Sequence, residues 1–253
     1  MRHRLPTKSD KYALNVKNMI HEYGLIIGPS KIRIKTDKEE AIPEVIREIK
    51  YHIQVLQEYV WRKPQFQYSL EPIDEDPNAP LIVRLMIEAS RAAGVGPMAS
   101  VAGAIADLGL RKLLEIGAKV AVIENGGEIA AYTSNREIVV SISTNENRLS
   151  GKIGLLITPE GAQLGIATST GKVDQQVISF GEADSVTVIA ENAAIADAAA
   201  TSICNAIVGE DAWKSISMGM KKAKSIRGVK GAIISYKGYI GLIGRIPRII
   251  KIK

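Results

Sequence analysis

The residues best suited to chemistry lie in the segment 193–208, which is rich in small apolar side chains and carries one carboxylate. Asp197 and Thr201 are four residues apart, so on a helix both side chains project from one face. A buried ionised carboxylate is costly unless it is paired or binds a metal ion. Carboxylate and hydroxyl oxygens are hard ligands that suit Mg²⁺. The competing interpretation is that Asp197 caps backbone amides, although Asn192 stands in the better position for that role.

A second candidate is the corner 124–128, which reads ENGGE between two expected strands. Paired glycines beside an asparagine favour a tight hairpin turn, and this structural role alone accounts for the pattern. The functional alternative is that Gly126 and Gly127 leave room for a ligand. Asn125 and Glu128 would then supply polar contacts to it.

A third candidate is the strand end 168–172, which reads TSTGK. The hydroxyls of Thr168 and Ser169, with exposed backbone amides, could bind an anion. The glycine spacing of a P-loop is absent, and no long helix follows directly. An ordinary hairpin corner is the alternative.

The elements that must position these residues form separate runs of helices and strands, which predicts an α+β fold with mostly antiparallel sheets. We expect a single domain over 1–253, with the motifs within 97–210. Residues 64–80 hold four prolines and a cluster of acids, which predicts a linker around a short strand at 66–70 and a possible subdivision of the chain. Helices are expected from 39 to before Pro64 and over 81–93, 98–116, 193–208 and 212–225. Strands are expected over 31–36, 119–124, 128–133, 137–143, 151–158, 163–168, 173–180, 185–190, 232–236 and 239–243.

Composition excludes several classes of protein. The chain has 253 residues with 46% apolar and 24% charged side chains, typical of a folded globular protein. A single cysteine, Cys204, excludes an internal disulfide framework and a cysteine metal cage. The three histidines all lie within the first 52 residues, which argues against a Ser-His-Asp triad in the later part of the chain.

The formal charge of +6 is distributed unevenly along the chain. Residues 1–63 hold 13 basic and 8 acidic side chains, 64–210 hold 9 and 18, and 211–253 hold 11 and 1. The basic ends do not carry the aromatic interleaving of a nucleic-acid protein, so such a partner is not favoured. For the C-terminal segment we favour a solvated surface. The alternative is that this segment binds RNA or anionic lipid. With no targeting signal or membrane-spanning segment recognised, we expect a cytoplasmic protein.

The order of these segments resembles the ApbE-type FAD:protein FMN transferases. That family has a helix with a pattern like aKGyavD, a GG-D/E corner, a TSG strand end, a strand SVTV and a helix ADalaT. The counterparts here read AGAIAD at 102–107, GGE at 126–128, TS at 168–169, SVTV at 185–188 and ADAAAT at 196–201. The match spans about residues 97–210, and its last element is the most specific.

The resemblance implies two T-fold-like repeats that bind a flavin nucleotide and Mg²⁺ between them. Asp197 and Thr201, joined by a backbone carbonyl near Val101, would hold the metal. Asp107 would belong with the residues of the two corners that contact FAD or FMN. The family reaction cleaves the FAD pyrophosphate and passes FMN to a hydroxyl of an acceptor protein.

Two departures of this sequence from the family's pattern leave two functions open. Ala102 stands at the family's lysine position, and the HxxxPxTG element before the SVTV strand is missing. The chain is therefore interpreted as a divergent branch with an unsettled reaction and no assigned catalytic residue. One hypothesis is a Mg²⁺-dependent enzyme of a flavin nucleotide or related phosphate-containing cofactor, and the other is a binding module without catalysis. The sequence leaves the substrate, the acceptor and the oligomeric state open.

Overall fold

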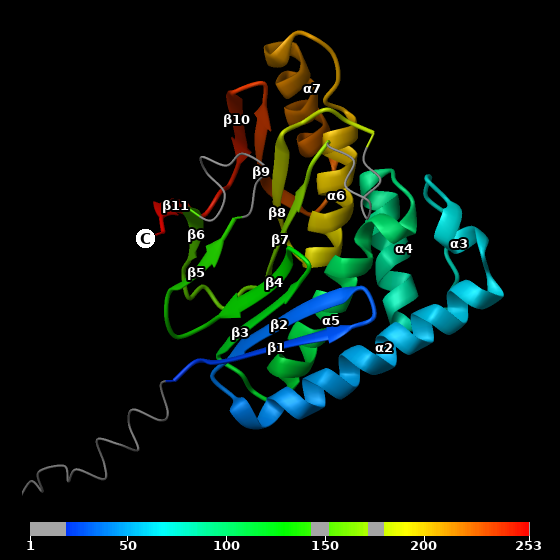
Figure 1. Cartoon of the computed structure of the whole chain (residues 1–253), viewed down its shortest axis with the longest axis vertical. Coiled ribbons are helices and arrows are strands. Elements are labelled where there is room, and N and C mark those ends of the chain that lie inside the picture. Colours follow the sequence, from blue (N-terminus) through cyan, green and yellow to red (C-terminus); the bar gives the residue numbers. More distant parts are fainter. Residues whose placement is uncertain (1–18, 143–151, 172–179, 253) are drawn as a thin grey trace, which may run out of the picture.

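A computed structural model of the chain describes residues 19–142, 152–171 and 180–252 (Figure 1). An eight-stranded sheet has the order β1-β2-β3-β4-β7-β8-β9-β10, and a small sheet has the order β11-β6-β5. All the strand pairs in the described part are antiparallel. The strands are β1 His21–Ile27, β2 Ser30–Thr36, β3 Val120–Asn125, β4 Glu128–Thr133, β5 Ile138–Ser141, β6 Ile153–Ile157, β7 Leu164–Ser169, β8 Ser185–Ala190, β9 Val229–Tyr236, β10 Tyr239–Gly244 and β11 Arg248–Lys251.

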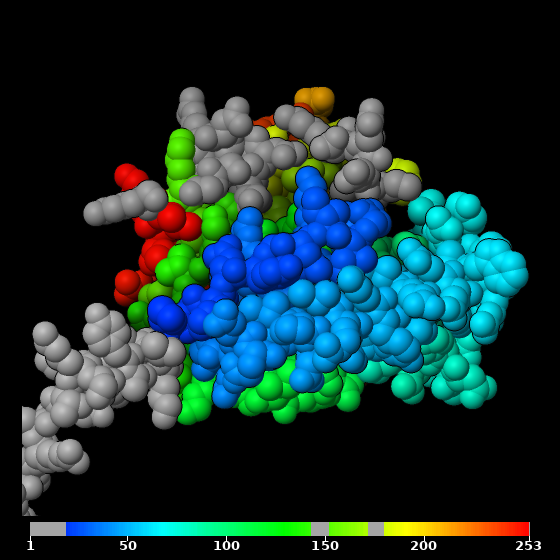
Figure 2. Space-filling view, turned by 60° about the horizontal axis from the view of Figure 1, so that its bottom comes forward, coloured from blue at the N-terminus to red at the C-terminus, as the bar shows by residue number. Residues whose placement is uncertain are grey.

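Helices cover one face of the large sheet, and α2 with α3 forms one side of the molecule (Figure 2). The helix α2 is amphipathic and buries Val45, Ile49 and Leu56 at helical spacing. In contrast, α6 is buried on nearly every face, in keeping with its alanine-rich sequence. The helices are η1 Glu39–Ala41, α2 Ile42–Arg62, α3 Gln65–Tyr68, α4 Leu81–Ala93, η2 Pro97–Ser100, α5 Val101–Glu115, α6 Ala193–Asn205 and α7 Ala212–Ser225.

The large sheet contains the same arrangement twice. Strands β1 and β2 are followed by helices and then by β3 and β4, and strands β7 and β8 are followed by α6, α7, β9 and β10. Each set of four strands is contiguous in the sheet, and β4 pairs with β7 where the two sets meet. The helices α5 and α6, one from each half, contact each other over this junction.

Side chains of the large sheet alternate between two cores. Ala121 and Ile123 face the helices, whereas Val122 packs against the small sheet on the opposite face. This alternation is what a strand with both faces covered requires. The molecule thus has three layers, with the large sheet between the helices and the small sheet.

The predicted α+β class and the antiparallel pairing are confirmed by this arrangement. The predicted short strand at 66–70 is wrong, because Gln65–Tyr68 forms the helix α3. Pro64 adopts a helical conformation there, and Phe66 is buried with its ring 5.3 Å from that of Tyr59. Strands β1 and β11 were not expected. The strand expected at 173–180 falls outside the described residues except at Phe180, and the possible subdivision near 64–80 stays a prediction.

None of the described helices is by itself long and apolar enough to cross a membrane. One pair of consecutive helical segments is long and apolar enough when the two are counted together, namely Leu81–Ala93 and Pro97–Glu115. This pair is bent by 103°.

Candidate functional site

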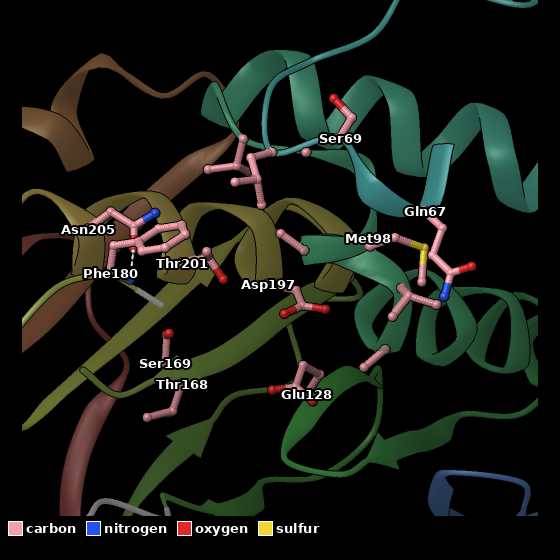
Figure 3. Close-up of a pocket in the computed structure, with 16 residues that line it drawn as sticks. Gln67, Ser69, Met98, Glu128, Thr168, Ser169, Phe180, Asp197, Thr201 and Asn205 are labelled. Carbon is pink, nitrogen blue, oxygen red and sulfur yellow. Dashed lines mark hydrogen bonds between the residues drawn. The ribbon is translucent and has the colours of Figure 1, made fainter. Parts of the chain in front are cut away.

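A cleft of about 380 Å³ lies where the two halves of the large sheet meet (Figure 3). Its walls come from the start of α5, the half-buried side of α6, the start of β4, the end of β7 and residues 67–70. Six predicted site residues line it together, from four elements distant in sequence: Val101, Glu128, Thr168, Ser169, Asp197 and Thr201.

Asp197 lies in the first half of α6 and reaches across to the start of α5. Its carboxylate accepts a hydrogen bond from the amide of Gly103 at 2.9 Å. Burial raises the pKa of Asp197 well above its ordinary value, and the charge of Glu128 raises it further. The amides of Gly103 and Ala102 oppose this rise by stabilising the charged form. Thr201, one turn later on α6, also lines the cleft, as the four-residue spacing predicts.

Glu128 faces the cleft from the first position of β4, below Asp197 in Figure 3. Burial raises its pKa to about 7, and the nearby charge of Glu124 adds to the effect. The turn before it is formed by Gly126 and Gly127, both with positive φ, as the hairpin interpretation requires. The same corner also supports the site, because the side-chain amide of Asn125 donates to the carbonyl of Ala102 at 3.3 Å. Asn125, Gly126 and Gly127 themselves do not line the described cleft.

Thr168 and Ser169 line the cleft from the last two positions of β7. The hydroxyl of Thr168 shares a hydrogen bond of 2.9 Å with that of Thr187 on the neighbouring strand. Ser169 is only 6% exposed, and its hydroxyl has no hydrogen-bond partner among the described residues. A buried polar atom without a partner is costly. Ser169 is therefore well suited to contact a bound ligand.

Asp107 does not line this cleft. Its two carboxylate oxygens accept hydrogen bonds from the amides of Ala193 and Ala194, each at 2.8 Å, at the start of α6. One of these oxygens also accepts from the side chain of Gln163 at 2.9 Å. Burial raises its pKa to about 6, and the two amides oppose the rise. The structure thus places Asp107 as a cap on the helix that carries Asp197.

The two aspartates cap each other's helices. Asp107 of α5 binds the start of α6, while Asp197 of α6 binds the start of α5. The tetrapeptide AIAD occurs at both places, as residues 104–107 and 194–197. This repeat was a signal in the sequence that could have predicted the pairing. The difference between the two sites lies in the cleft, which Asp197 lines and Asp107 does not.

The sequence interpretation missed the wall formed by residues 67–70. Gln67, Ser69 and Leu70 line the cleft, although this segment was expected to be a linker. A side chain on Gly96 would overlap the backbone of Ser69, so the glycine allows the segment to close over the start of η2. Such an approach between distant backbones has no periodic pattern from which it could be predicted.

The chemistry of the cleft favours a cation. Its described lining contains no Lys, Arg or His, and Asp197 and Glu128 are its two carboxylates. Within the described part of the chain, no three His, Cys, Asp or Glu side chains are grouped to hold a metal. A metal here would therefore depend on Asp197 together with hydroxyl and carbonyl oxygens. That donor set suits Mg²⁺, which commonly keeps several waters and substrate phosphates as ligands.

The fold is that of the ApbE proteins. Over 88% of this chain and 96% of the other, it matches the crystal structure of the ApbE protein from Thermotoga maritima with a TM-score of 0.59 and 13% identity. A variant of the flavin transferase ApbE from Vibrio cholerae matches with a TM-score of 0.50 and 16% identity, over 89% of this chain and 97% of that one.

A family model described as AbpE bacteria matches residues 15–224. The UPF0280 protein of Methanocaldococcus jannaschii is 37% identical over 90% of this chain and 92% of its own length. That of Methanothermobacter thermautotrophicus is 46% identical over 68% of this chain and 66% of its own length. The chain belongs to this ApbE-like family and, within it, to the UPF0280 proteins.

Proposed function

We propose that the protein is a Mg²⁺-dependent enzyme that binds a flavin nucleotide, or a related phosphate-containing cofactor, in this cleft. The observation that carries the proposal is the pair of half-buried carboxyl groups, Asp197 and Glu128, in a cleft whose described lining has no basic side chain. Burial raises the pKa of both carboxyl groups, and a bound divalent cation would stabilise their charged forms while attracting a phosphate, which the ionised carboxylates alone would repel. Phosphate binding here should therefore require a metal.

In this proposal Asp197, Thr201 and the carbonyl of Val101 hold Mg²⁺. The bound metal would neutralise charge that develops on the phosphate leaving group. The hydroxyl of Ser169, which has no partner among the described residues, would donate to a phosphate oxygen. Roles for Asn125, Gly126, Gly127 and Asp107 in cofactor binding stay predictions, with Asn125 and Asp107 acting through the helix starts that they hold.

The proposed reaction is transfer of FMN from FAD to a Ser or Thr hydroxyl of an acceptor protein. Its support is the ApbE fold, which the chain shares with proteins named flavin transferases. The alternative is a binding module on the same scaffold that no longer transfers flavin. A specific observation favours it, because the described lining offers no histidine or lysine to accept the acceptor's proton.

Calorimetric titration tests the metal site. FAD or FMN should bind in the presence of Mg²⁺ and should lose at least 100-fold in affinity when the metal is removed by EDTA. Asp197→Asn should cause a similar loss, because its amide is a weak metal ligand. The matched control is Asp74→Asn, which removes the same charge from an exposed loop position. Unchanged metal-dependent binding in the Asp197 variant would refute the assignment.

A second experiment separates the enzyme from the module. The protein is incubated with FAD, Mg²⁺ and candidate acceptor proteins, and mass spectrometry records a gain of FMN on the acceptor together with release of AMP. Tight Mg²⁺-dependent flavin binding without transfer to any acceptor would favour the module. Transfer that disappears with Asp197→Asn would establish the enzyme.

A further inference from the structure

The helix α7 presents an exposed face that combines lysines with large apolar side chains. Its buried side, which includes Ile216 and Gly219, packs on β9 and β10. At 100° per residue the opposite side falls within an arc of about 140°. That side holds two serines, Ser217 and Ser225, and five exposed residues here called the α7 face: Trp213, Lys214, Met218, Lys221 and Lys224.

The α7 face includes two large apolar side chains that are exposed. Trp213 is 61% exposed and Met218 is 44% exposed. The ring of Trp213 lies 5.1 Å from that of Tyr239, at the start of β10, and Tyr239 is itself 46% exposed. Two adjacent exposed aromatic rings with polar tips are typical of surfaces that enter the boundary between water and lipid.

The charged part is unpaired within the described residues. Lys214, Lys221 and Lys224 form no ion pair there, whereas Lys237 on the nearby turn binds Glu210. The closest acidic residue on the helix is Asp211 at its first end, where the side chain accepts a hydrogen bond from the amide of Lys214 at 3.0 Å. The positive charge of the α7 face is therefore available to an external anion.

We propose that the α7 face binds the surface of an anionic lipid bilayer. Lysines would contact lipid headgroup phosphates, while Trp213, Tyr239 and Met218 would enter the headgroup region. Figure 1 shows α7 with β9 and β10 at one end of the molecule. Proteins bind single-stranded nucleic acids in a groove that follows the backbone of the strand. The α7 face is a convex helix surface, so it suits a bilayer better than a single strand.

Co-sedimentation with lipid vesicles tests the proposal on the full chain. Vesicles of phosphatidylglycerol and phosphatidylcholine should bind the protein, and vesicles of phosphatidylcholine alone should not. Each lysine near an anionic surface contributes about fivefold to partitioning, so Lys214→Gln with Lys221→Gln and Lys224→Gln should weaken binding on the order of 100-fold. The matched control replaces Lys31, Lys50 and Lys119, three other exposed lysines, by Gln and should retain binding.

A fluorescence measurement reports on the apolar contact. With Trp61→Phe, Trp213 is the remaining tryptophan, and its emission should shift to shorter wavelength on anionic vesicles. The proposal is overturned if both triple variants lose binding equally, because net charge alone would then explain it. It is also overturned if vesicles leave the emission unchanged while single-stranded RNA shifts it, or if a dimer in solution already buries Trp213. These outcomes are independent of flavin binding.

Discussion

At the scale of single residues, Asp107 and Asp197 show how one residue type can serve two purposes in one repeated motif. Asp107 has both carboxylate oxygens bound to amides of α6 and lies outside the cleft. Asp197 accepts from the amide of Gly103 in α5 at 2.9 Å and also lines the cleft. Asn192 is the cap of α6, accepting from the amide of Ile195 at 2.8 Å, whereas Asp197 binds the start of α5. The capping interpretation of Asp197 thus applies to the neighbouring helix, and it is compatible with a ligand.

The buried carboxyl of Asp107 predicts a pH dependence of stability. Its pKa in the folded protein is about 6, above the ordinary value of 3.8. The protonated carboxyl of Asp107 makes its full contribution to stability below about pH 4. That contribution is lost as the pH rises through 6. The difference between the two pKa values corresponds to a loss of about 3 kcal/mol in the free energy of unfolding.

Asp107→Asn cannot ionise and should lack this part of the decline. Urea unfolding of both proteins at pH 4, 5, 6 and 7 measures this effect. As the pH rises, the free energy of unfolding should fall more for the wild type than for the variant. A constant difference across this range would show that Asp107 titrates at its ordinary value when folded.

At the scale of elements, the contact between α5 and α6 depends on Gly103. A Cβ at this position would overlap the carbonyl of Ala193, so a glycine is needed for the helices to approach so closely. The same close approach brings the amide of Gly103 to the carboxylate of Asp197. The geometry of the site is thus a consequence of helix packing.

Gly103→Ala should reduce the free energy of unfolding by at least about 2 kcal/mol, since neither backbone can move without disturbing the other. Gly24→Ala is the control, because a Cβ on Gly24 in β1 meets no atom within 4 Å. Its effect should stay within about 0.5 kcal/mol. Chemical denaturation of the two variants would contradict the prediction if their midpoints agreed.

The elements differ in how far the sequence predicts them. The helices α2 and α4 and most strands follow from periodicity, and the ADAAAT motif placed Asp197 and Thr201 on one face of α6, where the cleft lies. The segment 67–70 could not be found in this way, because its place depends on a backbone contact with Gly96 about 25 residues away. The sequence QFQY alternates as a strand would, but burial of Phe66 against Tyr59 favours a helical turn.

At the scale of the whole molecule, the two halves share a hydrophobic core and hydrogen bonds. The hydrophobic core on the helix-covered face of the large sheet extends from Ile49 in α2 to Ile234 in β9 and includes residues of both α5 and α6. The capping bonds of Asp107 and Asp197 cross between the halves in both directions. Because the cleft lies at this junction, its geometry requires both halves to be folded.

This coupling predicts that loss of one cap loosens both central helices. Asp107→Ala removes the acceptors at the start of α6, and α6 carries the carboxylate that caps α5, so amide hydrogen exchange should accelerate in both helices. Asp211→Ala is the matched control, because Asp211 caps α7, within its own half, through the amide of Lys214. It should accelerate exchange mainly in α7. If Asp107→Ala loosened α6 while α5 kept its full protection, the halves would open independently, and the cleft could lose its shape without global unfolding.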